Sequence, residues 1–216
     1  IDVDTQGRIA SVTPDADPGC FVAIPGLPNL HSHAFQRGMA GLTEHAGDSE
    51  DSFWTWRELM YRFLAHLTPE DVEAIATLAY VEMLEGGFTR VGEFHYLHHA
   101  PDGLPYSDRA EMATRIAAAA EAAGINLTLL PCFYAHGGIG GAPPAPGQRR
   151  FINDLDTFAA LVDGSRHAIA GLAGAALGLA PHSLRAATIE EIRCVADMAR
   201  PAEPLHIHVA EQVNEV

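Results

Sequence analysis

The chain has 216 residues, of which 48% are hydrophobic and 19% charged, so it can bury a sizeable core and is neither disordered nor collagen-like. Its 28 acidic and 13 basic side chains give a net charge of −15, which argues against a nucleic-acid partner or an anionic membrane face. No apolar run has the length needed to cross a bilayer, so we expect no membrane partner.

Cysteine usage and the chain ends add two expectations. Cys20, Cys132 and Cys194 are odd in number and widely spaced, which indicates a reducing compartment and hence a cytoplasmic protein. The chain opens in a strand-like alternation without Met and stops at Val216, directly after an apolar segment. We therefore expect it to be a piece of a longer protein.

Residues 3–24 show short apolar alternations broken by glycine and proline, which predicts small antiparallel strands. From Pro25 onward an apolar strand, a loop and a helix follow one another repeatedly. Short apolar runs of this kind are typical of parallel strands that are buried on both faces. The candidate strands are 26–31, 89–95, 125–133, 175–181 and 205–209.

Three helices are predicted between these strands. Thr68 is a candidate N-cap followed by Pro69 and two acidic residues, and a Gly-Gly pair at 86–87 ends the helix. Ser107 is the candidate cap of an alanine-rich helix that stops at Gly124. Thr188 and Glu191 form a capping box before a third helix with Ile189 on its apolar stripe.

Strands alternating with helices indicate a parallel α/β fold, either an open doubly wound sheet or a (β/α)8 barrel. No glycine fingerprint follows the first strand, which disfavours a nucleotide-binding sheet. Polar residues follow several strands, as in barrel enzymes, so we favour the barrel and expect about its first five strands. The Gly/Pro/Ala-rich residues 137–147 are either a flexible linker or a lid over the site.

His31 and His33 end the first buried strand. Side chains at i and i+2 of a strand point the same way, so both imidazoles can hold one metal ion. A strand-end pair bonded to nearby backbone is the structural alternative. A cupin is disfavoured because helices follow the pair.

The fifth predicted strand carries His206 and His208 on one face, with Glu211 three residues further on. Strict alternation points Glu211 the other way, so the strand must end near Ala210 for this carboxylate to return to the site. There an imidazole can bind the metal, and the carboxylate can carry a proton from water to a leaving nitrogen. Buried structural histidines are the alternative.

Two further segments end strands with polar side chains. His182 and Arg185 are suited to holding a carboxylate, Arg185 by a two-pronged hydrogen bond. The alternative is a helix start capped by Ser183 with a solvated arginine. Residues 93–99 contain three histidines and Tyr96, and we expect some of these imidazoles to lie behind the site or to be exposed.

The combination of residues 25–37, 180–185 and 206–211 resembles the amidohydrolase superfamily, and within it the formimidoylglutamate deiminases of histidine degradation. The resemblance extends over nearly the whole chain and includes residues 53–58 and 147–154. It implies a (β/α)8 barrel beside a small β-sandwich built from both chain ends. Residues 1–24 would then be part of the sandwich, and residues 25–216 the N-terminal portion of the barrel.

The resemblance also implies roles for individual residues. His31, His33 and His208 match three ligands of one divalent metal, Zn²⁺ with iron as the alternative, and Glu211 matches the proton-shuttling acid. The positions that hold the glutamate part of a small dicarboxylate substrate are matched by Gln36, Tyr96, His182 and Arg185. In the family's homodimer, the residue matching Arg57 reaches the site of the neighbouring subunit.

The implied reaction is hydrolysis of the formimino C–N bond of N-formimino-L-glutamate to N-formyl-L-glutamate and ammonia. The family also uses a histidine after the sixth strand and an aspartate after the eighth, and neither strand is present here, so we expect these 216 residues alone to be inactive. Two alternatives stay open. One is a deaminase or chlorohydrolase acting on a purine or triazine, and the other is a non-catalytic metal-binding fragment.

Overall fold

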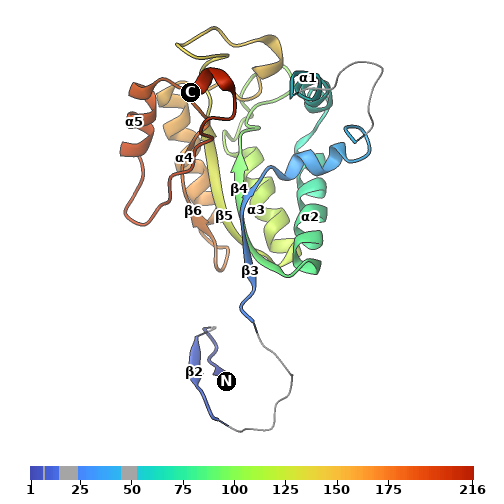
Figure 1. The fold of residues 1–216 in the computed structure, drawn as a ribbon, viewed down its shortest axis with the longest axis vertical. Coiled ribbons are helices and arrows are strands. Elements are labelled where there is room, and N and C mark those ends of the chain that lie inside the picture. Colours follow the sequence, from blue (N-terminus) through green and yellow to red (C-terminus); the bar gives the residue numbers. More distant parts are fainter. Residues whose placement is uncertain (7, 15–23, 45–52) are drawn as a thin grey trace.

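The structure is a computed structural model that describes residues 1–6, 8–14, 24–44 and 53–216, without the side chain of Asn214. It contains a larger sheet connected by helices and a separate two-stranded sheet near the N-terminus (Figure 1). No described helix is long and apolar enough to cross a membrane. In chain order the elements are β1 (Asp2–Val3), β2 (Ile9–Ser11), β3 (Leu27–Ser32), η1 (Ala34–Met39), α1 (Phe53–Leu64), α2 (Pro69–Glu85), β4 (Phe88–His95), α3 (Glu111–Ala123), β5 (Asn126–Phe133), η2 (Pro146–Gln148), α4 (Leu155–Ile169), β6 (Ala176–Leu177), β7 (Ala180–Pro181), α5 (Ile189–Asp197) and η3 (Val213–Glu215).

The larger sheet is parallel and has the strand order β3-β4-β5-β6. The short strand β7 pairs with β5 in the same register as β6 does. β6 and β7 therefore form one interrupted strand beside β5. Helices α2, α3, α4 and α5 contact one another in chain order, and all four also contact strands of the sheet. This arrangement confirms the α/β class and is that of a partial (β/α)8 barrel.

The core lies between the sheet and these helices. Val91 and Phe94 of β4 and Leu129 and Leu130 of β5 are fully buried, although the two residues of each pair point to opposite faces of their strand. Burial on both faces explains why these strands are nearly continuous apolar runs in the sequence. The carboxyl ends of β3, β4, β5 and β7 meet at one edge, because the strands are parallel.

Local sequence signals place two helix starts correctly. At α2 the Thr68 hydroxyl accepts the Asp71 N–H, and the Asp71 carboxylate accepts the Thr68 N–H. At α5 the pair Thr188 and Glu191 forms the same capping box. Each box satisfies N–H groups that a helix start leaves without partners.

The predicted cap of α3 is wrong. The helix begins at Glu111, and its N-cap residue Ala110 makes no side-chain bond to it. The Asp108 carboxylate accepts the Ala110 N–H instead, and the Asp108 carbonyl accepts the Glu111 N–H. A turn at Asp108 therefore starts the helix four residues after Ser107.

Two strand predictions need correction. The strand predicted at 175–181 is interrupted at Gly178, where a Cβ atom would lie 2.5 Å from the Pro204 carbonyl oxygen. The segment predicted as a strand at 205–209 has a single bridge, between Leu205 and Leu179. It still runs beside β7, since the N–H groups of His206 and His208 donate to the carbonyls of Leu179 and His182.

The N-terminal residues form the antiparallel pair β1 and β2, as predicted for part of this region. Residues 15–23, which include Cys20, lie outside the described residues. Cys132 is buried and Cys194 is exposed, and both are free thiols. In the loop at 137–147, Gly138 and Ala142 form an antiparallel bridge and η2 begins at Pro146, so part of the loop has regular structure. Whether it acts as a lid stays a prediction.

Candidate functional site

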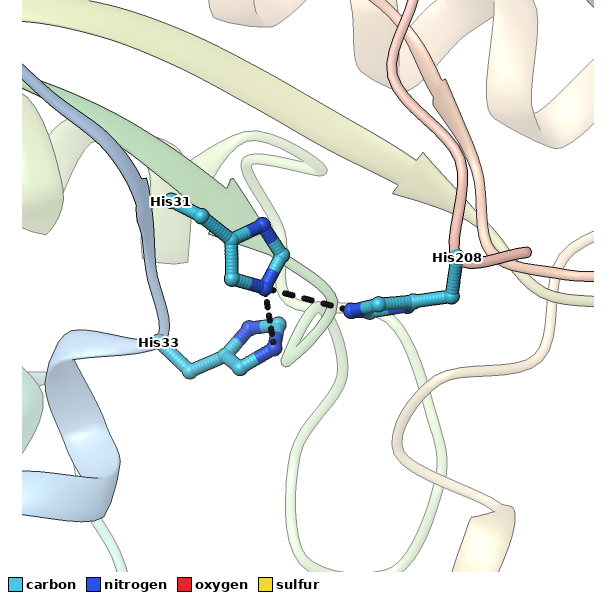
Figure 2. A group of neighbouring side chains, drawn as sticks. All are labelled: His31, His33 and His208. Atoms are coloured by element: carbon cyan, nitrogen blue, oxygen red, sulfur yellow. Dashed lines mark hydrogen bonds between the residues drawn. The ribbon is translucent and has the colours of Figure 1, made fainter. Parts of the chain in front are cut away.

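The structure brings together three histidines from opposite ends of the chain. The Nε2 atom of His31 lies 3.1 Å from Nε2 of His33 and 3.2 Å from Nε2 of His208, which is 177 positions away in the sequence. Figure 2 shows the three rings pointing toward one another, two from the end of β3 and one from the segment beside β7. In the described part of the chain, they form the only group of side chains suited to hold a metal ion.

A backbone contact fixes the orientation of His33. Its Nδ1 lies 2.8 Å from the carbonyl oxygen of Phe94 in β4. A carbonyl can only accept a hydrogen bond, so Nδ1 carries the proton, and in the neutral ring Nε2 keeps its lone pair. That lone pair faces the other two histidines, as a metal ligand requires.

Burial keeps the histidines neutral. It lowers the pKa of His33 to about 3 and that of His208 to about 4, and proximity of the rings to one another contributes to both shifts. The pKa of His31 is also lowered, by burial and by His206. At pH 7 the rings therefore present unprotonated nitrogens.

These residues fit a divalent metal ion. Nitrogens bound to one zinc ion at 2.0–2.1 Å in tetrahedral geometry lie about 3.3 Å apart, close to the spacings of 3.1 and 3.2 Å found here. Hydrogen bonds alone cannot satisfy both contacts, since Nε2 of His31 faces two ring nitrogens and carries only one proton or one lone pair. A cation at the centre resolves this.

A pocket of about 420 Å³ opens beside the histidines, and every side chain predicted for the site lines it. The same pocket therefore contains the three candidate metal ligands and groups that can bind a small anion. The predicted residues that line it are His31, His33, Gln36, Arg57, Tyr96, His182, Arg185, His208 and Glu211.

Glu211 reaches the pocket through a turn at the preceding residue. Ala210 has a φ of 55°, a left-handed conformation that is rare outside glycine. This is the end of the extended segment that the sequence required near Ala210. The Glu211 carboxylate then forms an ion pair with Arg185, which also pairs with Glu215 at 2.7 Å.

Arg57 lines the pocket from α1. Its guanidinium lies 4.3 Å from the centre of the Trp54 ring, a cation–π contact that holds the side chain against the helix. The structure thus places Arg57 at the pocket of its own subunit. Its predicted reach into a neighbouring subunit stays a prediction.

The remaining predicted residues have local partners. Gln36 donates a hydrogen bond of 3.2 Å to the buried Tyr96 hydroxyl, whose pKa is raised, chiefly by burial. His182 packs between Tyr134 and His208, with ring centres 4.7 and 4.9 Å away, and burial holds its pKa well below the usual value. Ser183 accepts the Arg185 N–H within a turn, whereas the next helix, α5, begins at Ile189 with Thr188 as its N-cap, so the alternative of a helix start capped by Ser183 is wrong.

Six further side chains, most of them aromatic, line the pocket but were not predicted from the sequence; we call them the aromatic wall. Several of its residues come from α1, which the strand and cap signals did not identify, while Tyr134 directly follows β5 at the edge where barrel sites form. Its position after a buried strand could therefore have predicted Tyr134 as a pocket residue. The missed lining residues are Phe53, Trp56, Met60, Tyr61, Tyr134 and Phe151.

The three histidines of the run at 95–99 do not line the pocket, although Tyr96 between them does. His95, His98 and His99 are all buried, so of the two options expected for them, exposure is excluded and a position behind the site remains. Nε2 of His98 bonds to the Cys132 carbonyl and Nε2 of His99 to the Ile152 carbonyl. These rings point away from the pocket because backbone carbonyls hold them.

Comparison with known proteins agrees with this geometry. Residues 22–216 match the amidohydrolase family. The whole chain is 51% identical over 220 residues to formimidoylglutamate deiminase of Pseudomonas aeruginosa. A crystal structure of an amidohydrolase from Brucella melitensis is 62% identical, with a TM-score of 0.84 over 88% of this chain. An adenosine deaminase from Xanthomonas campestris with bound zinc shares the fold, with 22% identity and a TM-score of 0.63 over 89% of this chain.

This chain spans about half the length of the proteins it matches. It covers 48% of the Pseudomonas deiminase, 42% of the Brucella amidohydrolase and 37% of the Xanthomonas deaminase.

Proposed function

The chain belongs to the amidohydrolase family, and from this premise we propose that the full-length protein hydrolyses the formimino C–N bond of N-formimino-L-glutamate. Water adds to the formimino carbon, and the terminal nitrogen leaves as ammonia, which gives N-formyl-L-glutamate. The observation that carries the proposal is a single pocket with three converging imidazoles and two guanidiniums. The 51% identity to a formimidoylglutamate deiminase supports the choice of substrate.

His31, His33 and His208 would hold a divalent metal ion, and their imidazole nitrogens suit Zn²⁺, with iron as the alternative. Such an ion, when bound, supplies Lewis-acid activation of water. The Phe94 carbonyl contributes by keeping the Nε2 lone pair of His33 aimed at the common point. No hydrogen bond within the described residues competes for that lone pair apart from the neighbouring imidazoles.

Arg185 and Arg57 would bind the two carboxylates of the substrate. In the structure, the Arg185 guanidinium pairs with Glu211 and Glu215, so protein carboxylates already occupy the position that a substrate carboxylate would take. Gln36, Tyr96 and His182 line the same pocket and supply hydrogen-bonding groups. Displacement from Arg185 would leave Glu211 free to carry a proton to the leaving nitrogen.

The proposal also covers the domain organisation, the cellular location and the oligomeric state of the protein. The separate β1–β2 pair supports assigning residues 1–24 to part of a β-sandwich, and the parallel sheet supports assigning residues 25–216 to the N-terminal portion of the barrel. The free cysteines are compatible with a cytoplasmic location. A homodimer is proposed from the family resemblance.

The test is ammonia release by the full-length protein from N-formimino-L-glutamate, compared with guanine and adenosine. Arg185→Ala should raise KM for formiminoglutamate roughly 10- to 150-fold, because a charge-assisted hydrogen bond contributes about 1.5–3 kcal/mol. Arg185→Lys keeps the charge but not the two-pronged geometry, so its KM should lie between those of the wild type and of Arg185→Ala.

Arg115→Ala is the matched control, since Arg115 also pairs with glutamates but lies on α3 outside the pocket. An unchanged KM in Arg185→Ala would refute the carboxylate-binding role. Faster turnover of guanine or adenosine than of formiminoglutamate would replace the proposed substrate with a purine.

A further inference from the structure

A buried glutamate contacts the chain segment that carries His31 and His33, and the site described above does not use it. Glu93 of β4 is 1% exposed and stands opposite Ser32, the residue between His31 and His33. A carboxyl group taken out of water is costly unless it is hydrogen-bonded. Its position therefore needs a physical reason.

The contacts of Glu93 supply that reason. Its Oε1 accepts a 2.7 Å hydrogen bond from the N–H of Ala34, the residue after His33. The hydroxyls of Ser32 and of Tyr80 in α2 approach the same carboxyl. Its Oε2 has no partner at full hydrogen-bond distance in the described part of the chain, so the Ala34 contact is its main attachment.

That contact stabilises the point where β3 becomes η1. His33 is the N-cap residue of η1, and its own side chain makes no capping bond, since Nδ1 is committed to Phe94. Glu93 satisfies the first N–H of η1 from a neighbouring strand. It therefore replaces the local cap that His33 cannot supply.

Three consecutive residues of β4 act on the end of β3. At Gly92 a Cβ would lie 2.7 Å from the Leu30 carbonyl oxygen, so only glycine permits this approach of the strands. Glu93 then bonds the backbone after His33, and the Phe94 carbonyl accepts from the His33 ring. Backbone and ring of one histidine are thus both held by β4.

We propose that Glu93 is a positioning residue whose carboxyl oxygen holds the turn from β3 to η1, so that His31 and His33 stay aimed at a common cation. The inference rests on the proposed function only in requiring metal binding at the three histidines. It does not depend on which substrate the protein hydrolyses.

The test measures zinc affinity of the full-length protein by competition with a chelating dye. Glu93→Leu removes the acceptor and should weaken zinc binding 10- to 100-fold, the usual cost of losing an outer contact that orients a ligand. Glu93→Gln keeps an oxygen acceptor and should stay within about threefold of the wild type. Glu93→Asp withdraws the acceptor by one methylene and should weaken binding about tenfold.

Gln148→Met is the matched control. Gln148 is also buried, and its Oε1 accepts the N–H of Ala145 before η2, at 2.7 Å. Its loss should lower the thermal midpoint as Glu93→Leu does but leave zinc affinity unchanged. If Glu93→Leu fails to fold, the comparison of Glu93→Asp with Glu93→Gln carries the test.

Two results would overturn the inference. Equal zinc affinity in the wild type, Glu93→Asp and any folded Glu93→Leu would reduce Glu93 to a structural residue. Equal losses in Glu93→Gln and Glu93→Asp would assign the effect to side-chain charge or shape rather than to the accepted hydrogen bond. A wild type that binds zinc but does not hydrolyse formiminoglutamate contradicts only the proposed substrate.

Discussion

The structure contains two groups of three histidines near β4, and the spacing of their rings does not reveal how they differ. In the pocket group, His31, His33 and His208, ring centres are 4.6–5.4 Å apart. In the buried group, comprising His95, His98 and His99, the distances between sequential neighbours are 5.4 and 6.2 Å. Crowding of imidazoles is therefore similar in the two groups.

Lowered basicity does not separate the groups either. Burial lowers the pKa of His95 to about 4 and that of His33 to about 3, so both are neutral at pH 7. Desolvation disfavours the charged ring whether or not a metal site is present. A lowered pKa on its own is a poor sign of function here.

What separates His33 of the pocket group from His98 of the buried group is which ring nitrogen meets a backbone carbonyl. In His98 this nitrogen is bonded to the Cys132 carbonyl, and its ring is locked into the core. In His33 the carbonyl contact is made by Nδ1, which leaves Nε2 facing His31. One choice of nitrogen makes a structural histidine and the other makes a candidate ligand.

The largest expected effect tests this contrast directly. His208→Ala should abolish stoichiometric zinc binding and lower kcat/KM for formiminoglutamate by at least about a thousandfold, because a metal ion provides several kcal/mol of transition-state stabilisation. His98→Ala should keep zinc within about threefold of the wild type. Zinc content by atomic absorption and ammonia release by the full-length protein are the measurements.

The contrast breaks if folded His98→Ala loses zinc as completely as His208→Ala. The two groups would then act as one network through β4. Retention of zinc by His208→Ala would instead remove His208 from the proposed ligands.

The free energy of unfolding should be affected more by His98→Ala than by His208→Ala, the reverse of the order expected for zinc binding. In the presence of a chelator, His98→Ala should lower the free energy of unfolding by about 1–3 kcal/mol, because the buried Cys132 carbonyl loses its partner. His208→Ala should cost less than about 1 kcal/mol, since its ring is partly exposed and it bonds mainly to other pocket histidines. Urea unfolding at pH 7 measures both.

Added zinc provides the matching control. It should raise the unfolding free energy of the wild type and of His98→Ala by mass action, but not that of His208→Ala. Equal stabilisation of all three proteins would place zinc elsewhere.

Local chemistry is what the sequence predicts well. The capping boxes at Thr68 and Thr188 involve residues three apart, so they can be recognised without knowledge of the fold. The buried strands β4 and β5 are recognisable because no face of them needs polar residues. The turn at Ala210 was anticipated because the site chemistry required Glu211 to return to it.

The sequence does not predict which way a side chain points relative to elements that are distant along the chain. Nothing in residues 95–99 shows that His98 donates to the Cys132 carbonyl of β5 while Tyr96 lines the pocket. The aromatic wall depends on how α1 packs across the pocket mouth. The role of Glu93 depends on the register of β4 against β3, which shifts irregularly between Asn29 and Ser32.

The smallest expected effect concerns acid. Because the folded pKa of His95 is about 4 and the unfolded value about 6.5, the unfolded chain binds more protons between these values, so stability falls as pH decreases from about 6.5 toward 4. From pH 7 to pH 6 this histidine should account for less than about 1 kcal/mol. His95→Gln should flatten the pH dependence of the urea midpoint in chelator, whereas the exposed-site control His66→Gln should not. A slope that persists in His95→Gln and disappears in His33→Gln would contradict this expectation and locate the acid sensitivity in the pocket group.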